Sequence, residues 1–289
     1  MLAVGGCSPL AQNAAVAVRK PAAGTTFDKN DPGTWVLPIQ AYLPTDSELK
    51  QISGARKTLV QECMKSLGFS WNPVPDLPQI GPKTLTDWRY GIHDLPLAEK
   101  RGYKPDAGEQ AAYDAAAERG AADEAALTEA ETSALNGGGT PSGGKKPPSG
   151  GCVEQANRKL SLSATDAVSA RKINADEFNR AKLEPEVVRA FAAWSACLKE
   201  GGYSYKEPLD ASDDERFASA EVTPLERATA TADIRCRRRT QVAKIWFDAE
   251  VRLQKAAIED QAEALEQERR RLDAAVKKAA EAVAQGSPQ

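Results

Sequence analysis

Two of the five cysteines lie in matching local sequences, and this repetition constrains the fold more than any other feature of the 289-residue chain. The stretch CMKSLGFSW at 63–71 agrees with CLKEGGYSY at 197–205 in its Cys, apolar, Lys, Gly, aromatic, Ser and aromatic positions. In each copy a helical run ends near a Gly and continues into an aromatic, Ser, aromatic strip. The match predicts an internal duplication in which the same helix end occurs twice.

The cysteines other than the one near the N-terminus number four, as expected of two disulfides formed in an oxidising compartment. Four cysteines allow three pairings. If the chain is duplicated, each copy should join the Cys of its turn to the next Cys downstream. This predicts the disulfides Cys63–Cys152 and Cys197–Cys236, and it is wrong if Cys63 instead lies beside Cys197.

Cys7 follows the small residues of Leu2-Ala3-Val4-Gly5-Gly6, as the cysteine of a lipoprotein signal does. Only six residues precede it, too few for a complete signal peptide, so residues 1–44 are interpreted as a truncated lipoprotein signal followed by a tether. We expect lipidation at Cys7 when a full leader is present. The alternative is a chance cysteine in an unstructured N-terminus.

Composition and periodicity divide the rest of the chain. We predict a first helical unit at 45–135, a Gly, Ser and Pro linker at 136–151, a second helical unit at 152–257 and a solvated, charged helix end at 258–289. The segment 69–105 between the first helix and the Ala-rich stretch is rich in Pro and aromatics and should be ordered but irregular.

Helix signals are clearest at three places. A helix is predicted from Thr45 to Gly68, another from Pro185 to Cys197, and a long one from Thr223, with no internal Gly or Pro before Gly286. The fold class is therefore mainly α, with duplicated helical units, irregular Pro and aromatic segments, two disulfides and a long C-terminal helix. No run of about 20 apolar residues indicates a membrane-spanning helix.

The chain resembles the predicted lipoproteins and secreted proteins of high-GC actinomycetes. The resemblance rests on the lipoprotein-like start, WRYG at 88–91 with RGY at 101–103, PSGGC at 148–152, FAAWSAC at 191–197 and the long helix of 232–265. It covers most of the chain after about residue 35. It implies an extracytoplasmic location and a helical, cysteine-paired body, and it supplies no catalytic residues to carry over.

Several functions lack their usual sequence support. The net charge of −3 provides no global basic field for nucleic acid. No P-loop, nucleophile elbow, zincin or dinucleotide motif occurs, and no C-x-x-C pair is present, so no cofactor and no metal are expected. His93 is the one histidine, and its neighbour Asp94 could support a base, although a surface or structural role is favoured.

Two clusters remain as candidate binding residues. Aromatic side chains could line a groove for peptide or glycan, or they could pack back on the helices: Phe69, Trp71, Trp88, Tyr90, Tyr203 and Tyr205. A basic cluster could meet anionic lipid or cell-wall phosphate, although pairing with nearby acids is favoured: Arg235, Arg237, Arg238, Arg239 and Lys244.

Three functional hypotheses follow. The first is a non-enzymatic envelope protein, anchored in the membrane by lipid or secreted, that binds an envelope protein or glycan. The second is a cell-wall glycan or peptide hydrolase, which needs two carboxyl groups about 5 to 9.5 Å apart in one pocket. The third is an intracellular helical scaffold that uses the C-terminal helix as a coiled coil. The sequence favours the first and leans away from an enzyme.

Overall fold

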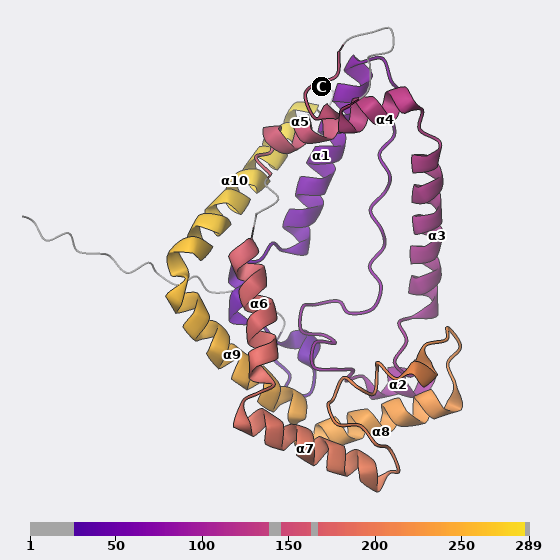
Figure 1. Ribbon diagram of the computed structural model, residues 1–289, viewed down its shortest axis with the longest axis vertical. Helices are drawn as coiled ribbons and strands as arrows, with labels where there is room; N and C mark the ends of the chain where they lie inside the picture. Colours follow the sequence, from indigo (N-terminus) through magenta and orange to yellow (C-terminus); the bar gives the residue numbers. More distant parts are fainter. Residues whose placement is uncertain (1–25, 139–145, 163–166, 287–289) are drawn as a thin grey trace, which may run out of the picture.

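The computed structural model describes residues 26–138, 146–162 and 167–286, and every regular element in these ranges is a helix (Figure 1). The mainly-α prediction is therefore confirmed, whereas Cys7 lies outside the described residues. The α-helices are α1 (Asp46–Ser66), α2 (Leu95–Arg101), α3 (Ala107–Ala125), α4 (Glu129–Asn136), α5 (Gly151–Lys159), α6 (Val168–Ala181), α7 (Pro185–Glu200), α8 (Pro224–Thr240), α9 (Val242–Asp260) and α10 (Ala262–Gly286). Short 3-10 helices are η1 (Pro32–Thr34), η2 (Pro38–Ala41) and η3 (Glu215–Phe217).

Helix α1 begins where the sequence predicts. The Thr45 hydroxyl accepts a hydrogen bond from the Glu48 N–H at 3.2 Å, and the Glu48 carboxylate accepts the Thr45 N–H at 2.8 Å. This reciprocal capping box satisfies two backbone donors that the first helical turn leaves without partners.

The two matching sequences form the same turn. Gly68 and Gly202 both adopt left-handed φ angles, +93° and +85°, and nothing lies within 4 Å of a Cβ placed on either. In the first copy the Phe69 N–H reaches the Met64 carbonyl at 3.0 Å, and in the second copy the equivalent Tyr203-to-Leu198 bond is 3.1 Å. Both helices thus end in a Schellman motif, in which the φ angle rather than lack of space favours glycine.

The cysteine before each turn forms the disulfide that the repeat predicts. Cys63 at the end of α1 is bonded to Cys152 at the start of α5, with a Cα–Cα distance of 5.7 Å. Cys197 at the end of α7 is bonded to Cys236 in α8, also with a Cα–Cα distance of 5.7 Å. Both distances fall within the usual range for disulfides.

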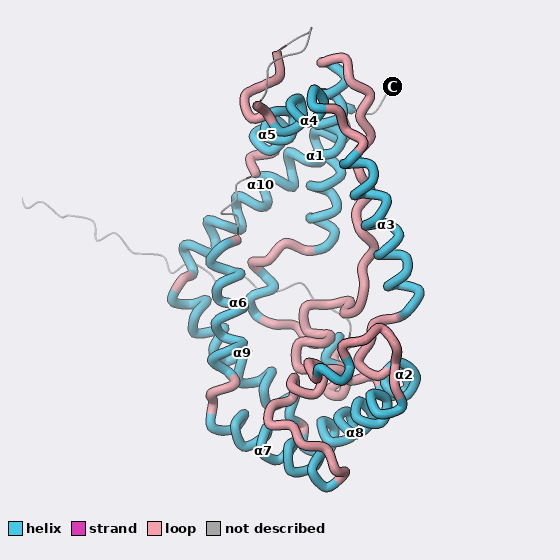
Figure 2. Tube along the Cα trace, turned by 45° about the vertical axis from the view of Figure 1, so that its right-hand side comes forward, coloured by secondary structure: helices cyan, strands magenta, loops and turns pink. Residues whose placement is uncertain are grey.

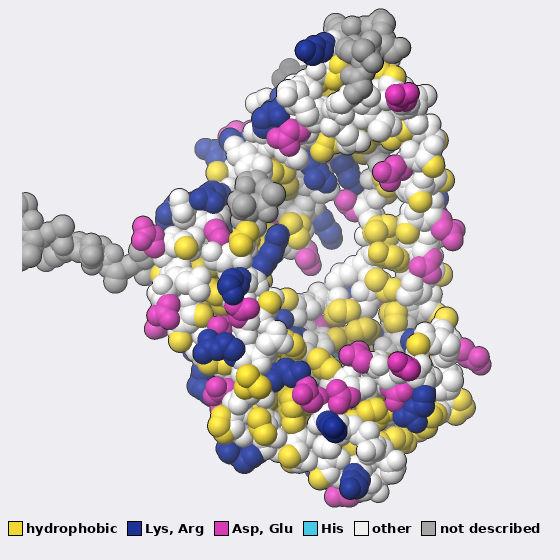
Figure 3. Space-filling model, viewed as in Figure 1, with side chains coloured by type: hydrophobic (Ala, Val, Ile, Leu, Met, Phe, Trp, Pro, Cys, Tyr) yellow, Lys and Arg dark blue, Asp and Glu magenta, His cyan; other side chains and the backbone are white. Residues whose placement is uncertain are grey.

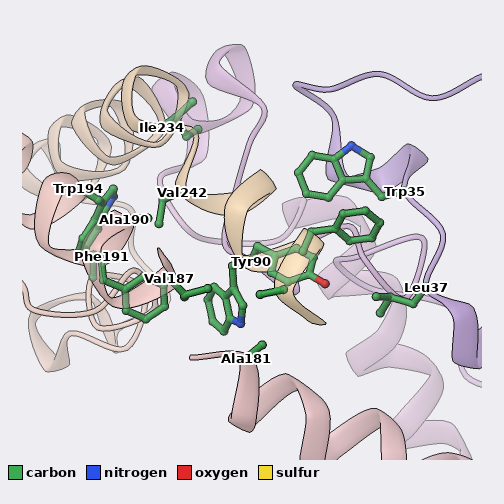
Figure 4. Packing of buried hydrophobic residues seen from close by; sticks show 14 of the residues in the cluster. Trp35, Leu37, Tyr90, Ala181, Val187, Ala190, Phe191, Trp194, Ile234 and Val242 are labelled. Atoms are coloured by element: carbon green, nitrogen blue, oxygen red, sulfur yellow. The ribbon is translucent and has the colours of Figure 1, made fainter. Parts of the chain in front are cut away.

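The buried apolar side chains form two separate clusters. The larger, here called the major core, joins α6, α7, α8 and α9 to the N-terminal segment 35–42 and to the region around Tyr90. In Figure 4, Tyr90 lies between Trp35 and the side chains of α7. The smaller cluster, here called the minor core, is formed by α1, α4, α5 and the outer half of α10.

These cores do not follow the predicted unit boundaries. Helix α5 falls in the predicted second unit at 152–257, yet it packs against α1 and α4 of the first unit because Cys152 is bonded to Cys63. Conversely, Tyr90 and α2 from the predicted first unit at 45–135 belong to the major core. Sequence order and packing therefore divide the chain differently.

The C-terminal region is not one long helix. Gln241 has a φ of +54° and separates α8 from α9, and Gln261 separates α9 from α10. The prediction of an uninterrupted helix from Thr223 to Gly286 is therefore wrong. The sequence did not indicate either break, because neither of them carries a Gly or Pro. At the start of α8 the Thr223 hydroxyl accepts the Glu226 N–H at 3.1 Å, and the Glu226 carboxylate accepts the Tyr103 N–H, also at 3.1 Å.

The prediction that residues 258–289 are mostly solvated is also wrong for α10. Leu265 packs in the major core, and Leu272, Ala275 and Ala279 are buried in the minor core against α1. Small alanines allow the two helices to approach closely. A helix face made largely of Ala lacks large apolar side chains, so the sequence alone predicts a solvated face. Helix α10 consequently ties the two cores together.

Polar contacts reinforce this tie. Arg269 of α10 forms an ion pair with Glu48 of α1 and donates to the Leu43 carbonyl at 3.2 Å. On the same helix, the Glu268 carboxylate accepts the N–H groups of Ser169 and Ala170 at 2.9 and 3.3 Å. A carboxylate at this position supplies the cap that the first turn of α6 otherwise lacks.

The helices together make an open frame. Helices α9 and α10 run along one side, and α3 stands on the other side as a strut with no buried residue (Figures 1 and 2). The space-filling view in Figure 3 shows an opening through the molecule, bounded by α1 and α6 on one side and by α3 on the other. The extended segment that follows α1 runs along this opening.

Candidate functional site

The first aromatic strip lies at the surface of the minor core. Phe69 and Trp71 follow the Schellman turn of α1, and both pack against the minor core while remaining half-buried. The indole Nε1 of Trp71 donates no hydrogen bond to any other described residue. The rings are thus held by the core but leave part of their surface accessible.

Two hollows adjoin this strip, and a third adjoins the first of them. One of about 860 Å³ lies between α1 and the 68–72 segment, and a second of about 420 Å³ lies between that segment and the ends of α3 and α4. Both are lined by Ser70, Trp71 and Asn72. A third of about 550 Å³, between α1, α5 and α10, shares Glu62 and Gln285 with the first. We call these three hollows together the Trp71 trough.

Uncharged polar side chains make up half of the residues that line the largest hollow. Besides the aromatic pair, its lining includes hydroxyl and amide side chains from three elements: Thr58, Gln61, Ser70, Asn72 and Gln285. Its one acid and one base are Glu62 and Lys65. The volumes are of the size that proteins use for ligands, and the lining can both donate and accept hydrogen bonds.

In the second aromatic strip Tyr203 is half-buried, but Tyr205, which corresponds to Trp71, is closed in. The Tyr205 hydroxyl donates to Asp214 Oδ2 at 2.7 Å and accepts from Arg216 Nη2 at 3.0 Å, and the ring is buried. Burial and the Asp214 carboxylate raise the pKa of Tyr205 to about 12. The Ser195 hydroxyl donates a hydrogen bond to the Tyr205 backbone carbonyl at 2.5 Å. Every polar group of this ring is therefore used internally.

The six aromatic residues considered as a groove are not gathered in one place. Phe69 and Trp71 belong to the minor core, whereas Tyr90, Tyr203 and Tyr205 belong to the major core or pack against it. Trp88 is half-buried and covers Gly81. Only the first aromatic pair lines the trough.

Tyr90 takes part in a buried polar network instead. Its hydroxyl donates to Glu250 Oε2 at 2.7 Å, and Arg89 Nη2 reaches Glu250 Oε1 at 2.6 Å. The Gln254 amide bridges Glu250 and the Ile39 N–H. Burial and the neighbouring Glu250 carboxylate raise the pKa of Tyr90 well above its ordinary value. The network joins α9 to the N-terminal segment, which is a structural role.

A second buried carboxylate serves the same purpose. Asp233 accepts the Trp194 indole N–H at 2.8 Å and the Tyr103 hydroxyl at 3.2 Å, and it forms an ion pair with Arg237 at 2.7 Å. Burial raises the pKa of Asp233 despite these partners. Because its partners fill its surroundings, Asp233 fixes the packing of α7 on α8.

His93 bonds to acids other than its sequence neighbour. Its Nε2 lies 2.7 Å from Asp87 Oδ1 and its Nδ1 lies 3.5 Å from Asp31, while Asp94 caps α2 through the Leu97 N–H at 3.0 Å. The small hollow beside His93 is lined by no Ser, Thr or Cys. The imidazole therefore links two loops, and no hydroxyl or thiol nucleophile lines that hollow.

The basic cluster is paired, as the favoured interpretation expected. Arg237 is buried against Asp233, and Arg238 donates to the His93 carbonyl at 3.0 Å. The remaining members form ion pairs with acids on their own or neighbouring helices: Arg235 with Glu99, Arg239 with Glu200 and Lys244 with Asp248. The pairing weakens the case for a phosphate-binding face.

The amide side chains of the trough were missed at the level of sequence. Gln61 and Asn72 are exposed polar residues, which no local pattern distinguishes from other surface positions. The sequence feature that could indicate the trough is the Phe69 and Trp71 pair. Two large aromatic side chains beside a half-exposed turn are expected to be covered by a core or by a ligand.

The fold and the trough together define an all-helical, disulfide-bonded protein with an open aromatic surface on its minor core. Comparisons of the chain with protein-family models, with curated proteins and with solved structures found no match. None of the helices described is long and apolar enough to cross a membrane. Within the same part of the chain, no group of three His, Cys, Asp or Glu side chains is placed to hold a metal ion.

Proposed function

We propose that this chain is a non-enzymatic binding protein of the extracytoplasmic face of the cell membrane, anchored by lipid at Cys7, which holds an envelope component in the Trp71 trough. The observation that carries the proposal is the difference between the two aromatic strips. At the position that corresponds to Trp71, the Tyr205 hydroxyl is bonded to Asp214 and Arg216, whereas Trp71 lines two hollows and its indole N–H has no partner among the described residues.

The two disulfides support the location. Disulfides persist in oxidising compartments and are rare in the cytosol, and both bonds here join helices that are far apart in sequence. The small residues before Cys7 and the resemblance to predicted lipoproteins and secreted proteins of high-GC actinomycetes support the same compartment. An intracellular coiled coil gains no support, because Gln241 and Gln261 interrupt the C-terminal helix.

The anchor is tested with the natural leader in place. A radiolabelled fatty acid should label the wild-type chain in the membrane fraction, and Cys7→Ser should abolish the label. Equal labelling of both proteins would contradict the anchor.

The binding role is tested with isolated cell envelopes. Wild-type protein should sediment with them, and Trp71→Ala should reduce the bound fraction at least tenfold. Trp88→Ala is the matched control, because Trp88 is also half-buried but does not line the trough. Equal retention of the wild type and Trp71→Ala would remove the trough from the proposed function.

A further inference from the structure

We infer that the ligand of the Trp71 trough is a linear, uncharged glycan chain that crosses Trp71 and occupies the hollows on both sides of it. The inference rests on the proposed function and specifies its ligand. It depends on three features of the trough: its continuity across Trp71, its charge balance and the chemistry of its side chains.

Continuity follows from the shared lining residues. Ser70, Trp71 and Asn72 line both the hollow of about 860 Å³ beside α1 and the hollow of about 420 Å³ beside α3 and α4. A ligand that fills both must therefore pass over this short segment. Glu62 and Gln285 extend the surface in the other direction to the hollow beside α10. A series of connected hollows suits an extended chain better than a compact molecule.

The charges of the trough nearly cancel. Along its three hollows the acids are Glu62, Asp123, Glu124 and Glu281, and the bases are Lys65, Lys159 and Lys278. A nucleic acid requires a clear excess of Lys and Arg over acids to neutralise its phosphates, and acidic peptides are recognised by clustered arginines. Neither condition is met, so the lining favours a ligand without net charge.

The remaining side chains distinguish a glycan from an uncharged peptide. Sugars present many hydroxyl groups, which both donate and accept hydrogen bonds, together with apolar C–H faces. The amides of Gln61, Asn72 and Gln285 can donate and accept at the same site, and the rings of Phe69 and Trp71 supply flat apolar surfaces. A proline-rich peptide offers few donors and would leave these amide oxygens without partners.

Isothermal titration of the full chain tests this inference with uncharged linear oligosaccharides, the N-acetylglucosamine hexamer and the glucose hexamer, each compared with its trimer. At least one hexamer should bind, and it should bind at least tenfold more tightly than its trimer because only the hexamer spans both hollows. Trp71→Ala should weaken hexamer binding at least tenfold and reduce its advantage over the trimer. Trp88→Ala should leave both affinities unchanged.

Two substitutions at exposed positions test the same inference if Trp71→Ala fails to fold. Gln61→Ala and Asn72→Ala remove amides that are exposed and make no hydrogen bond to other described side chains, so the melting temperature should not change while hexamer affinity falls several-fold. Lys255→Ala, an exposed change on α9 away from the trough, is the control and should leave hexamer affinity unchanged. If Gln61→Ala and Asn72→Ala weaken hexamer binding no more than Lys255→Ala does, the assignment is overturned.

The outcomes also separate this inference from the proposed function. If wild-type protein sediments with envelopes through Trp71 but binds neither hexamer, the glycan is wrong and the proposed function stands. Tight binding of a proline decamer in place of the hexamers would identify a peptide and overturn the inference. If the protein neither sediments with envelopes nor binds any of these probes, both proposals fail.

Discussion

The minor and major cores contain the same helix end but differ in what covers it. In both, a Cys-bearing helix ends at a left-handed glycine, and a disulfide joins it to a later helix. In the major core, Asp214 and Arg216 then close over Tyr205, and buried carboxylates bind the helices together. In the minor core, none of the residues that the structure describes closes over Trp71 in the same way.

The difference shows that the same helix end can be followed by a buried, internally bonded aromatic residue or by a half-exposed one. Among the described residues, the major core includes ten of the twelve largest fully buried side chains: Trp194, Trp246, Tyr42, Tyr90, Leu37, Ile39, Leu198, Ile234, Ile258 and Leu265. The minor core depends on a few leucines, one methionine and several alanines. We therefore expect the minor core to be the less stable of the two, and the following predictions test that expectation.

The largest effect should come from removing α10. Truncation after Asp260 removes Leu272, Ala275 and Ala279 from the minor core and leaves the buried face of α1 exposed to water. Burial of one large apolar side chain contributes about 1.5 to 3 kcal/mol, so the loss should be several kcal/mol and should unfold the minor core. Hydrogen exchange should show α1 and α5 unprotected while α7 and α8 remain protected.

The control for this truncation is removal of residues 287–289 alone, which leaves all of α10 in place. An unchanged melting temperature after truncation at Asp260 would mean that α10 does not stabilise α1. Loss of protection in α7 and α8 as well would mean that the two cores unfold as one.

The second effect concerns the disulfides. In the loop-entropy model, a bond that closes 89 residues contributes about 4.5 kcal/mol and one that closes 39 residues about 4 kcal/mol. Replacing Cys63 and Cys152 by Ala should therefore lower the free energy of unfolding slightly more than replacing Cys197 and Cys236. Denaturant unfolding of the two double variants measures the difference.

The packing of the two cores should increase the difference between the two double variants. Without Cys63–Cys152 the minor core retains few large side chains, so its exchange protection should be lost, whereas the major core should remain folded without Cys197–Cys236. The opposite order of stability would show that the major core depends more on its disulfide than on its aromatic packing.

Much of this comparison was predictable from the sequence, because its determinants are local. Thr45 marks the start of α1, the glycines mark the two turns, and the repeat predicts both disulfides. Mainly-α architecture follows from the same signals. Such features depend on a few neighbouring residues with strong conformational preferences.

The features that sequence could not predict depend on distant contacts. Gln241 and Gln261 end helices although glutamine is a good helix former, so tertiary packing determines both breaks. Asp233 and Glu250 are acidic residues yet fully buried, because partners far along the chain form hydrogen bonds with them. The trough was only half predicted, since its aromatic rings were recognised but its amide side chains were not.

A smaller effect should come from the repeated glycines. Gly68→Ala and Gly202→Ala each place a side chain at a left-handed φ, which costs roughly 1 to 2 kcal/mol. The two losses should be equal within error if the turns are equivalent. Only Gly68→Ala should also weaken ligand binding, because Gly68 lines the largest hollow.

Gly54→Ala is the matched control for these variants. Gly54 lies inside α1 with nothing within 4 Å of an added Cβ, so alanine should stabilise the helix by about 0.5 to 1 kcal/mol. Destabilisation by Gly54→Ala would mean that the losses at the two turns need not come from their left-handed φ angles. A clear inequality between the two turn variants would show that the turns are not equivalent.

The smallest effect should be a pH dependence of the minor core through Glu48. Burial alone would raise the pKa of Glu48, but hydrogen bonds from Arg269 and Thr45 outweigh it and hold the pKa below its ordinary value. A lowered pKa in the folded state stabilises the protein above the unfolded-state pKa, and that contribution is lost as the pH falls through the folded-state pKa. Glu48→Gln should therefore cost about 1 kcal/mol or less at pH 7, as expected of a single partly buried ion pair. The difference between wild type and variant should shrink below about pH 4.5, in denaturant unfolding followed from pH 7 to 3. Glu263→Gln, an exposed change on α10, should show no such difference, and a gap for Glu48→Gln that stays constant with pH would exclude the ion pair as its cause.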